Sequence, residues 1–287
     1  MVPEGTSVPM ETSWLHRRRP NPDAALRLFC FPYAGAGASL FRAWGNAFPP
    51  EVDVCSVQLP GRETRLAEPA FRRMSDLVPA IVRALSLQLD RPFAFFGHSL
   101  GALVAFETAR HLRTEHGLEP ERLFVSGHGA PHEAARAPGA TDMHALPERE
   151  FTEKLRELHG TPEEVLQNEE LRRLLFPILR ADVELCETYV YKPDEPLRCP
   201  IVAFGGLQDR RVSRAALEAW RHETLASFEV RMFPGDHFFL NSHRPLLVRV
   251  VRQHRRDGPA SVLVNPTSSA VSRVTYVERS NCAPRVL

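Results

Sequence analysis

A serine lies between two glycines in the stretch FAFFGHSLGALVAFETAR, which spans residues 93–110. Gly97-His98-Ser99-Leu100-Gly101 follows the pattern G-x-S-x-G at the point where an apolar run gives way to an amphipathic stretch. This context predicts a tight strand-to-helix turn that presents the serine hydroxyl at the start of the helix. Flanking glycines remove Cβ atoms that would clash in such a turn. We interpret Ser99 as a candidate nucleophile, and the alternative is a helix-capping serine.

A serine hydroxyl becomes an effective nucleophile when a base takes its proton and an acid orients that base. Asp209 follows the apolar run PIVAFGG, and His237 follows the run FEVRMFPG. Both residues come after predicted strands, on the side where open parallel sheets build their sites. Asp236 is the neighbour of His237, but immediate neighbours rarely face each other well enough. The predicted catalytic residues are Ser99, Asp209 and His237, and chance placement on two suitable loops is the competing explanation.

Twelve histidines are present, so several others compete for the role of base. His98 is adjacent to the serine, but its side chain should point away from the hydroxyl, which indicates a packing role. His128 and His132 follow the next predicted strand and could line a pocket, and His243 opens the last predicted helix.

A serine nucleophile also needs two backbone donors that stabilise the oxyanion. The N–H of Leu100 supplies one, because it directly follows the nucleophile at the start of a helix. The second is expected from the loop PYAGAGAS, whose small residues allow close backbone approach. Ala34 is the best candidate in that loop.

Strand-like apolar runs alternate with helical patterns along most of the chain. The predicted strands are LRLFCF, VDVCSVQL, FAFFG, RLFVSG, PIVAFGG and FEVRMFPG, and the main predicted helices cover residues 74–89 and 100–117, RAALEAWRHET and RPLLVRVVRQH. This alternation predicts an α/β fold with a mostly parallel central sheet flanked by helices. Continuous apolar runs are typical of parallel strands that are covered on both faces.

The chain divides into three predicted parts, the second of which carries an insertion. Residues 1–24 are polar and rich in proline and arginine, and we expect a flexible N-terminal arm. Residues 25–257 form the α/β domain, and residues 258–287 are expected to be a flexible tail. Within the domain, residues 140–195 are helical and charged with no strand candidate, which predicts a helical insertion. Such an insertion could cover the site as a lid, and an ordinary extra helical layer is the alternative.

Composition excludes several classes of function. There are 36 basic and 35 acidic residues, so no global field favours nucleic acid or an anionic membrane. No apolar run reaches the ~20 residues of a membrane span, and no secretory h-region opens the chain. The five cysteines are scattered and never in C-x-x-C spacing, which argues against zinc and disulfides and favours a cytoplasmic protein.

Five motifs, in this order, carry a resemblance to a known family: FCFPYAGAGAS, VQLPGRETR, FFGHSLGALVAFE, CPIVAFGGLQD and FPGDHFFL. They resemble the stand-alone type II thioesterases that accompany modular polyketide synthases and nonribosomal peptide synthetases. The resemblance covers about residues 14–255. It implies an α/β-hydrolase with a helical lid that hydrolyses unproductive acyl groups from carrier proteins through an acyl-serine intermediate.

Matched motif by motif, Ser99 corresponds to the family's nucleophile, Asp209 to its acid and His237 to its base. Ala34 and Leu100 correspond to its oxyanion amides, although relatives often read AGG where this chain has AGAG. The resemblance implies no metal and no cofactor of the protein's own, because the 4′-phosphopantetheine belongs to the partner. It implies short acyl chains as substrates and acyl or peptidyl carrier domains as partners, and a monomer is favoured.

Carrier proteins are usually acidic, so arginines near the site could form a docking rim, although a solvated charged face is the simpler explanation. The candidates are Arg62, Arg65, Arg72, Arg73, Arg210 and Arg211. Phe238, Phe239 and residues of the insertion are candidates for the pocket floor. Two other functions stay open: another serine hydrolase, such as a carboxylesterase or lipase, and a non-catalytic binding scaffold.

Overall fold

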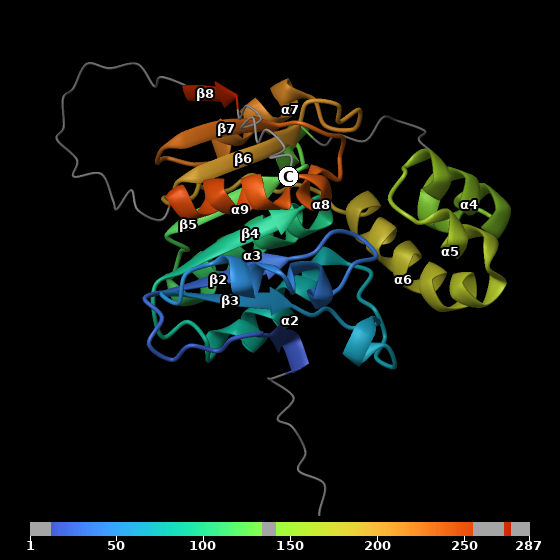
Figure 1. Ribbon diagram of the computed structural model, residues 1–287, viewed down its shortest axis with the longest axis horizontal. Coiled ribbons are helices and arrows are strands. Elements are labelled where there is room, and N and C mark those ends of the chain that lie inside the picture. The colour runs from blue at the N-terminus through green and yellow to red at the C-terminus, as the bar shows by residue number, and fades with distance from the viewer. Residues whose placement is uncertain (1–12, 134–141, 255–272, 277–287) are drawn as a thin grey trace, which may run out of the picture.

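The computed structural model describes residues 13–133, 142–254 and 273–276 of the 287-residue chain (Figure 1). Eight strands form one sheet in the order β1-β3-β2-β4-β5-β6-β7-β8. The strands are β1 (Leu15–His16), β2 (Leu26–Phe31), β3 (Val52–Val57), β4 (Phe93–His98), β5 (Arg122–Ser126), β6 (Ile201–Gly206), β7 (Phe228–Phe233) and β8 (Arg273–Tyr276). All neighbours pair in parallel except β1 and β3. The predicted mostly parallel sheet is confirmed.

Helices cover both faces of the sheet, with α9 across one face and α2 and α3 behind the other (Figure 1). The helices of the main body are α1 (Trp44–Ala47), α2 (Met74–Ser86), α3 (Leu100–His116), α7 (Arg214–Glu218), α8 (Phe239–Ser242) and α9 (Arg244–Gln253). Alternate strand residues face opposite cores, so Phe95 packs with α2 and α3 while Phe96 packs with α1 and α9. Burial on both faces explains why the strands read as unbroken apolar runs.

The helical insertion contains α4 (Glu148–Glu157), α5 (Glu163–Gln167) and α6 (Glu169–Glu187), and it stands beside the sheet (Figure 1). Its apolar residues form a small core of their own, which includes Phe151, Leu166 and Phe176. The helical character expected for residues 140–195 therefore holds from residue 142 to the end of α6 at Glu187, whereas residues 188–195 are irregular.

The two terminal segments differ from the expectation of loose arms. Within residues 13–24, β1 pairs with β3, and the carbonyl of Trp14 accepts a hydrogen bond from the N–H of Gln58 at 2.8 Å. Within residues 258–287, β8 pairs with β7. Both segments supply backbone partners to an open sheet edge, which composition does not reveal. Residues 1–12 and the rest of the C-terminal segment lie outside the described residues.

None of the helices in the described part of the chain combines the length and the apolarity that crossing a bilayer requires.

Candidate active site

The predicted strand-to-helix turn is present between β4 and α3. Ser99 has φ 53° and ψ −120°, and its N–H donates to the carbonyl of Ser126 at 2.7 Å. A Cβ atom on Gly97 would collide with the carbonyl oxygen of Gly101, and one on Gly101 would collide with that of Phe31. The two glycines are therefore required by close backbone approach, as the motif predicts.

Asp209 and His237 meet at the carboxyl ends of β6 and β7. His237 Nδ1 lies 2.8 Å from Asp209 Oδ2, and Asp209 Oδ1 accepts the N–H groups of Arg211 at 2.8 Å and Val212 at 3.3 Å. Burial raises the pKa of Asp209, but the hydrogen bond and charge of His237 outweigh it, so the pKa lies below its usual 3.8. An ionised Asp209 fixes the proton of neutral His237 on Nδ1 and leaves Nε2 as an acceptor.

His237 Nε2 is buried and has no hydrogen-bond partner among the described residues. Asp236, the rejected alternative, is exposed and accepts instead from the N–H of Phe238 at 2.9 Å. Ser99 follows β4 at the same carboxyl edge of the sheet, with β5 between it and the strands of the other two residues. The geometry thus gathers the three predicted residues at one edge of the sheet.

Gly127 is a residue of this site that the sequence reading passed over. It has φ 61°, and a Cβ atom there would lie 2.8 Å from His98 Cε1 and 3.4 Å from His237 Cε1. Only glycine fits this conformation with so little space, so the close approach of His237 depends on it. The available signal was a glycine directly after the apolar run RLFVS.

His98 has the packing role expected of it. It is fully buried, its Nδ1 lies 2.8 Å from Ser126 Oγ, and its ring centroid lies 5.3 Å from that of His237. Burial and then the nearby His237 lower its pKa to about 3. His98 is therefore neutral near pH 7 and adds no positive charge beside His237.

The other histidines make separate contacts. His128 Nδ1 lies 2.6 Å from the carbonyl of Gly129, and burial lowers its pKa. His132 pairs with Glu223, and His243 Nδ1 lies 3.0 Å from Ser242 Oγ. Neither of these last two contacts Asp209 or His237.

The predicted oxyanion donors come from two touching segments. Leu100 is the first residue of α3, where N–H groups lack an intrahelical acceptor. The loop after β2 carries Ala34, and the tight contact of Gly101 with the carbonyls of Phe31 and Pro32 holds that loop against the start of α3.

The insertion reaches the site through Phe238 and Arg211. The ring of Phe238 lies 5.2 Å from that of His237 and 5.4 Å from that of Tyr33, between centroids. A Cβ atom on Gly160, in the insertion, would come within 2.7 Å of Phe238, and Arg211 donates to the carbonyl of Leu158. Phe238 therefore lies at the mouth of the site.

Phe239, the other candidate for the pocket floor, lies in the hydrophobic core with its ring centroid 5.6 Å from that of His98. It is fully buried and stacks on Phe233 at 5.3 Å between ring centroids, within the core beneath α9. It is the first residue of α8.

Two of the proposed docking arginines are buried, so a docking role for them is excluded. Arg62 is 4% exposed and Arg65 is 6% exposed. Arg62 forms a bidentate pair with Asp182 of α6, at 2.6 and 2.8 Å, and Arg65 lies over the ring of Trp14 at 4.1 Å. The remaining four arginines are exposed, and a rim built from them stays a prediction.

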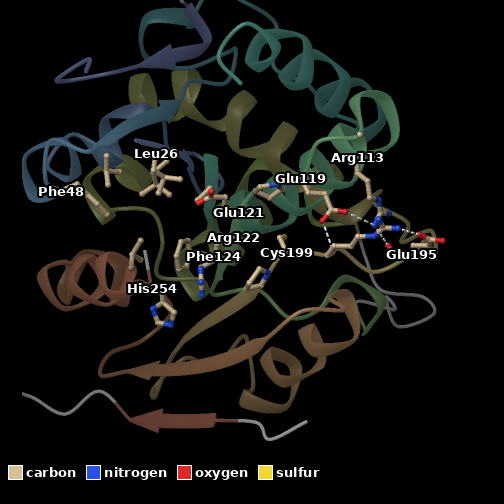
Figure 2. A pocket seen from close by; sticks show the side chains of 18 residues that line it. Leu26, Phe48, Arg113, Glu119, Glu121, Arg122, Phe124, Glu195, Cys199 and His254 are labelled. Carbon is tan, nitrogen blue, oxygen red and sulfur yellow. Dashed lines mark hydrogen bonds and ion pairs between the residues drawn. The ribbon is translucent and has the colours of Figure 1, made fainter. Parts of the chain in front are cut away.

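A cavity of about 730 Å³ lies at the opposite end of the sheet (Figure 2). Its lining includes Leu26, Arg122 and Pro200, which stand at or just before the amino ends of β2, β5 and β6. None of the three predicted catalytic residues borders it, so it is not the place where their chemistry occurs.

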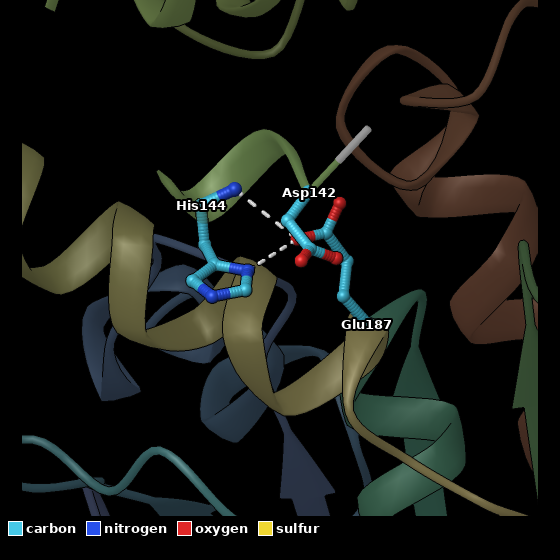
Figure 3. A group of neighbouring side chains, drawn as sticks. All are labelled: Asp142, His144 and Glu187. Atoms are coloured by element: carbon cyan, nitrogen blue, oxygen red, sulfur yellow. Dashed lines mark hydrogen bonds and ion pairs between the residues drawn. The ribbon is translucent and has the colours of Figure 1, made fainter. Parts of the chain in front are cut away.

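The start and the end of the insertion are joined by Glu187 (Figure 3). Its carboxylate accepts the N–H groups of Met143 at 2.8 Å and His144 at 3.1 Å, and it also contacts His144 Nδ1 at 2.6 Å. Glu187 closes α6, whereas Met143 and His144 lie at the first described residues of the insertion. This joint fixes the two ends of the insertion to each other.

Comparison with known proteins agrees with this geometry. The sequence model of the thioesterase domain family matches residues 26–255. The gramicidin S biosynthesis protein GrsT of Aneurinibacillus migulanus is 48% identical over 236 residues, which cover 82% of this chain and 91% of GrsT. The thioesterase PikA5 of Streptomyces venezuelae is 39% identical, covering 90% of this chain and 92% of PikA5.

A solved structure shows the same fold. The type II thioesterase BorB from the borrelidin biosynthetic cluster superposes with a TM-score of 0.76 at 36% identity, covering 84% of this chain and 97% of BorB. The resemblance noted from the five motifs is thereby confirmed. With a family model over most of its length and near-full-length relatives well above 30% identity, this chain belongs to the thioesterase domain family and has the α/β-hydrolase fold.

Proposed function

We propose that this protein is a type II, or editing, thioesterase that hydrolyses aberrant or short acyl groups from the phosphopantetheine thioester of carrier proteins. The family and its relatives make it a hydrolase of thioesters. The observation that supports a serine mechanism is the Asp209–His237 hydrogen bond of 2.8 Å, which leaves a buried, unpartnered Nε2 at the carboxyl edge where Ser99 lies.

In the first half-reaction, His237 Nε2 takes the proton of Ser99 Oγ while Oγ attacks the thioester carbonyl carbon. The carbonyl oxygen becomes an oxyanion, which the N–H groups of Leu100 and Ala34 stabilise. The C–S bond then breaks, the sulfur receives the proton from His237, and the acyl group stays on Ser99 as an ester.

In the second half-reaction, His237 removes a proton from water, which attacks the acyl-Ser99 carbonyl. Collapse of the second oxyanion returns the proton to Ser99 Oγ and releases a carboxylic acid. Ionised Asp209 stabilises the imidazolium that forms in both halves. The sulfur leaving group departs more readily than an alkoxide, so positioning and water delivery carry most of the task.

The partners in this proposal are acyl or peptidyl carrier domains of a modular synthase. Their 4′-phosphopantetheine is part of the substrate, and the protein itself uses no cofactor. GrsT and PikA5 are named for a biosynthetic pathway and a thioesterase activity, which supports this assignment. We place the protein in the cytoplasm because its four described cysteines are free thiols.

The test compares a short-chain acyl carrier protein, the matching acyl-N-acetylcysteamine thioester and the matching oxygen ester. We expect the thioesters to be hydrolysed faster than the ester, with release followed by intact mass. Ser99→Ala should lower kcat by about 10⁶-fold, since it removes the attacking atom.

A strong preference for the oxygen ester would instead identify a carboxylesterase. Full hydrolysis by Ser99→Ala would favour the binding scaffold and remove the serine mechanism.

A further inference from the structure

The motif QLPGRE, residues 58–63, lies beside the loop that carries Ala34. We call residues 33–38 the oxyanion loop. Gln58 Oε1 accepts the N–H of Ala38 at 2.9 Å, and Gln58 Nε2 donates to the carbonyl of Arg62 at 2.9 Å. The first of these hydrogen bonds joins the motif to the loop, and the second stabilises the motif itself.

Arg62 and Asp182 form a buried ion pair directly under this loop. The guanidinium donates to both carboxylate oxygens, at 2.6 and 2.8 Å, and also to the carbonyl of Ala36 at 3.2 Å. Asp182 is fully buried, and its Oδ2 accepts the N–H of Gly35 at 2.7 Å. The pair therefore binds two backbone groups of the loop, the N–H of Gly35 and the carbonyl of Ala36.

Glu63 holds Ser39, the residue that directly follows the oxyanion loop. Its carboxylate accepts the hydroxyl of Ser39 at 2.5 Å and the N–H of Ser39 at 3.2 and 3.3 Å. Glu63 itself has φ 48°, a conformation that is costly for a residue with a Cβ atom. A Cβ atom on Gly37 would collide with the Glu63 side chain, so loop and motif are packed tightly.

The insertion also contacts the oxyanion loop, because Asp182 belongs to α6. A Cβ atom on Gly35, which has φ 80°, would lie 2.5 Å from Leu179 of the same helix. Two residues one turn apart on α6 therefore fix Gly35, one by packing and one by a hydrogen bond.

A buried ion pair gives little net stability, and replacing both partners with apolar residues is often neutral or stabilising. This pair does something that an apolar pair cannot do: it supplies a fixed acceptor for Gly35 N–H. We propose that Asp182 is a positioning residue whose hydrogen bond with the Gly35 N–H sets the direction of the Ala34 N–H and so completes the oxyanion hole. The proposal rests on the proposed function only in taking Ser99 as nucleophile and Ala34 as a donor.

Two double variants distinguish the effect of losing the Arg62–Asp182 ion pair from the effect of losing the hydrogen-bond acceptor of Gly35 N–H. Arg62→Met/Asp182→Leu removes both, whereas Arg62→Met/Asp182→Asn removes the charges but keeps an amide oxygen for Gly35 N–H. Neither leaves an uncompensated buried charge, so both avoid the severe destabilisation of a single substitution. The number of competent sites in each preparation is counted by titration of Ser99 with a fluorophosphonate.

We expect kcat per titrated serine to fall about 10- to 100-fold in the leucine variant, with KM unchanged within about twofold. An oxyanion donor acts in the transition state, so its displacement appears in kcat. The asparagine variant should retain kcat within a few-fold of wild type. The rate of fluorophosphonate labelling should follow the same order, since the phosphoryl oxygen occupies the same hole.

Arg27→Met/Asp53→Leu is the matched control, because Arg27 and Asp53 form another buried pair, at 3.2 Å, near the amino ends of β2 and β3. This variant should keep wild-type kcat per titrated serine, whatever its thermal midpoint. Equal kcat in the leucine and asparagine variants, or an equal loss in the control, would overturn the proposal.

The outcome is independent of which substrate the protein prefers. If wild type hydrolyses the oxygen ester and not the thioester, the proposed function fails, but the same hole serves both substrates and the variants are compared on the ester. If neither substrate is hydrolysed, the labelling rate of Ser99 alone decides.

Discussion

Ser99 combines a positive φ of 53° with ψ −120°, and a residue with a Cβ atom adopts this conformation at a cost of about 1–3 kcal/mol. The surrounding contacts enforce it, because Gly97 and Gly101 leave the turn no room to relax. This conformational free energy is spent because the turn must place the Ser99 hydroxyl at the end of β4, beside the first N–H groups of α3.

We predict that Ser99→Gly is more stable than Ser99→Ala by about 1 kcal/mol in the free energy of unfolding. Both variants lose the hydroxyl, but only glycine relieves the backbone strain, and its greater freedom in the unfolded chain offsets part of that gain. Urea unfolding of the two variants measures the difference. An alanine variant that equals or exceeds the glycine variant would show that the turn is not strained.

His98 should make the fold sensitive to acid. Its pKa is about 3 in the folded protein against an ordinary 6.5, so between these values the unfolded chain binds a proton that the folded chain does not. Its contribution is complete above pH 6.5 and is lost as the pH falls toward 3, at up to about 1.4 kcal/mol per pH unit.

Urea unfolding at pH 7 and pH 5 tests this. We expect wild type to lose about 2 kcal/mol more than His98→Gln over that interval, because glutamine takes up no proton. Parallel losses in the two proteins would mean that other groups control the acid response.

The positions of single residues could be predicted from the sequence where the residue belongs to a local motif. Ser99, Asp209 and His237 each follow a recognisable strand, so their shared edge could be predicted. The pairing of Arg62 with Asp182 could not, because 120 positions separate them and both are charged residues that usually lie in solvent. Burial of a charge depends on a partner that only the tertiary structure supplies.

Among the elements, the insertion is the one whose attachment can be probed. Glu187 holds the N–H groups of Met143 and His144, so it protects the start of the insertion directly. We predict that Glu187→Ala increases amide hydrogen exchange at residues 143 and 144, because those donors lose their acceptor.

Hydrogen exchange with mass spectrometry measures this in the full-length protein. Glu153→Ala is the control, since Glu153 is an exposed residue of α4 that pairs with exposed Arg149 at 3.4 Å. Unchanged exchange at residues 143 and 144 in Glu187→Ala would show that the joint does not hold the insertion.

Elements with a strong pattern were predicted well, and β1 and β8 were missed. Strands such as β4 and β6 are buried on both faces and form apolar runs of six residues. β1 has two residues and β8 has four, too short for a pattern to stand out from irregular chain. Their pairing is decided by the edges of β3 and β7, which are remote in sequence.

For the whole molecule, the α/β alternation accounts for the mostly parallel pairing of the strands, but it does not determine their order in the sheet. BorB shares this fold over 97% of its own length. What alternation could not foretell is that α6 would lie against the loop after β2, because helices outside the repeating pattern have no fixed place on the sheet.

The contact of β1 with β3 bears on how copies of this protein behave at high concentration. An unpaired edge strand is a template with which a strand of a second chain can pair. A very short edge strand and charged side chains discourage such pairing. β1 covers the end of β3 with two residues, and Arg17 beyond it reaches Asp53 at 3.7 Å. We infer that residues 15–17 disfavour edge-to-edge pairing between the sheets of two copies, and so favour solubility, although this segment takes no part in catalysis.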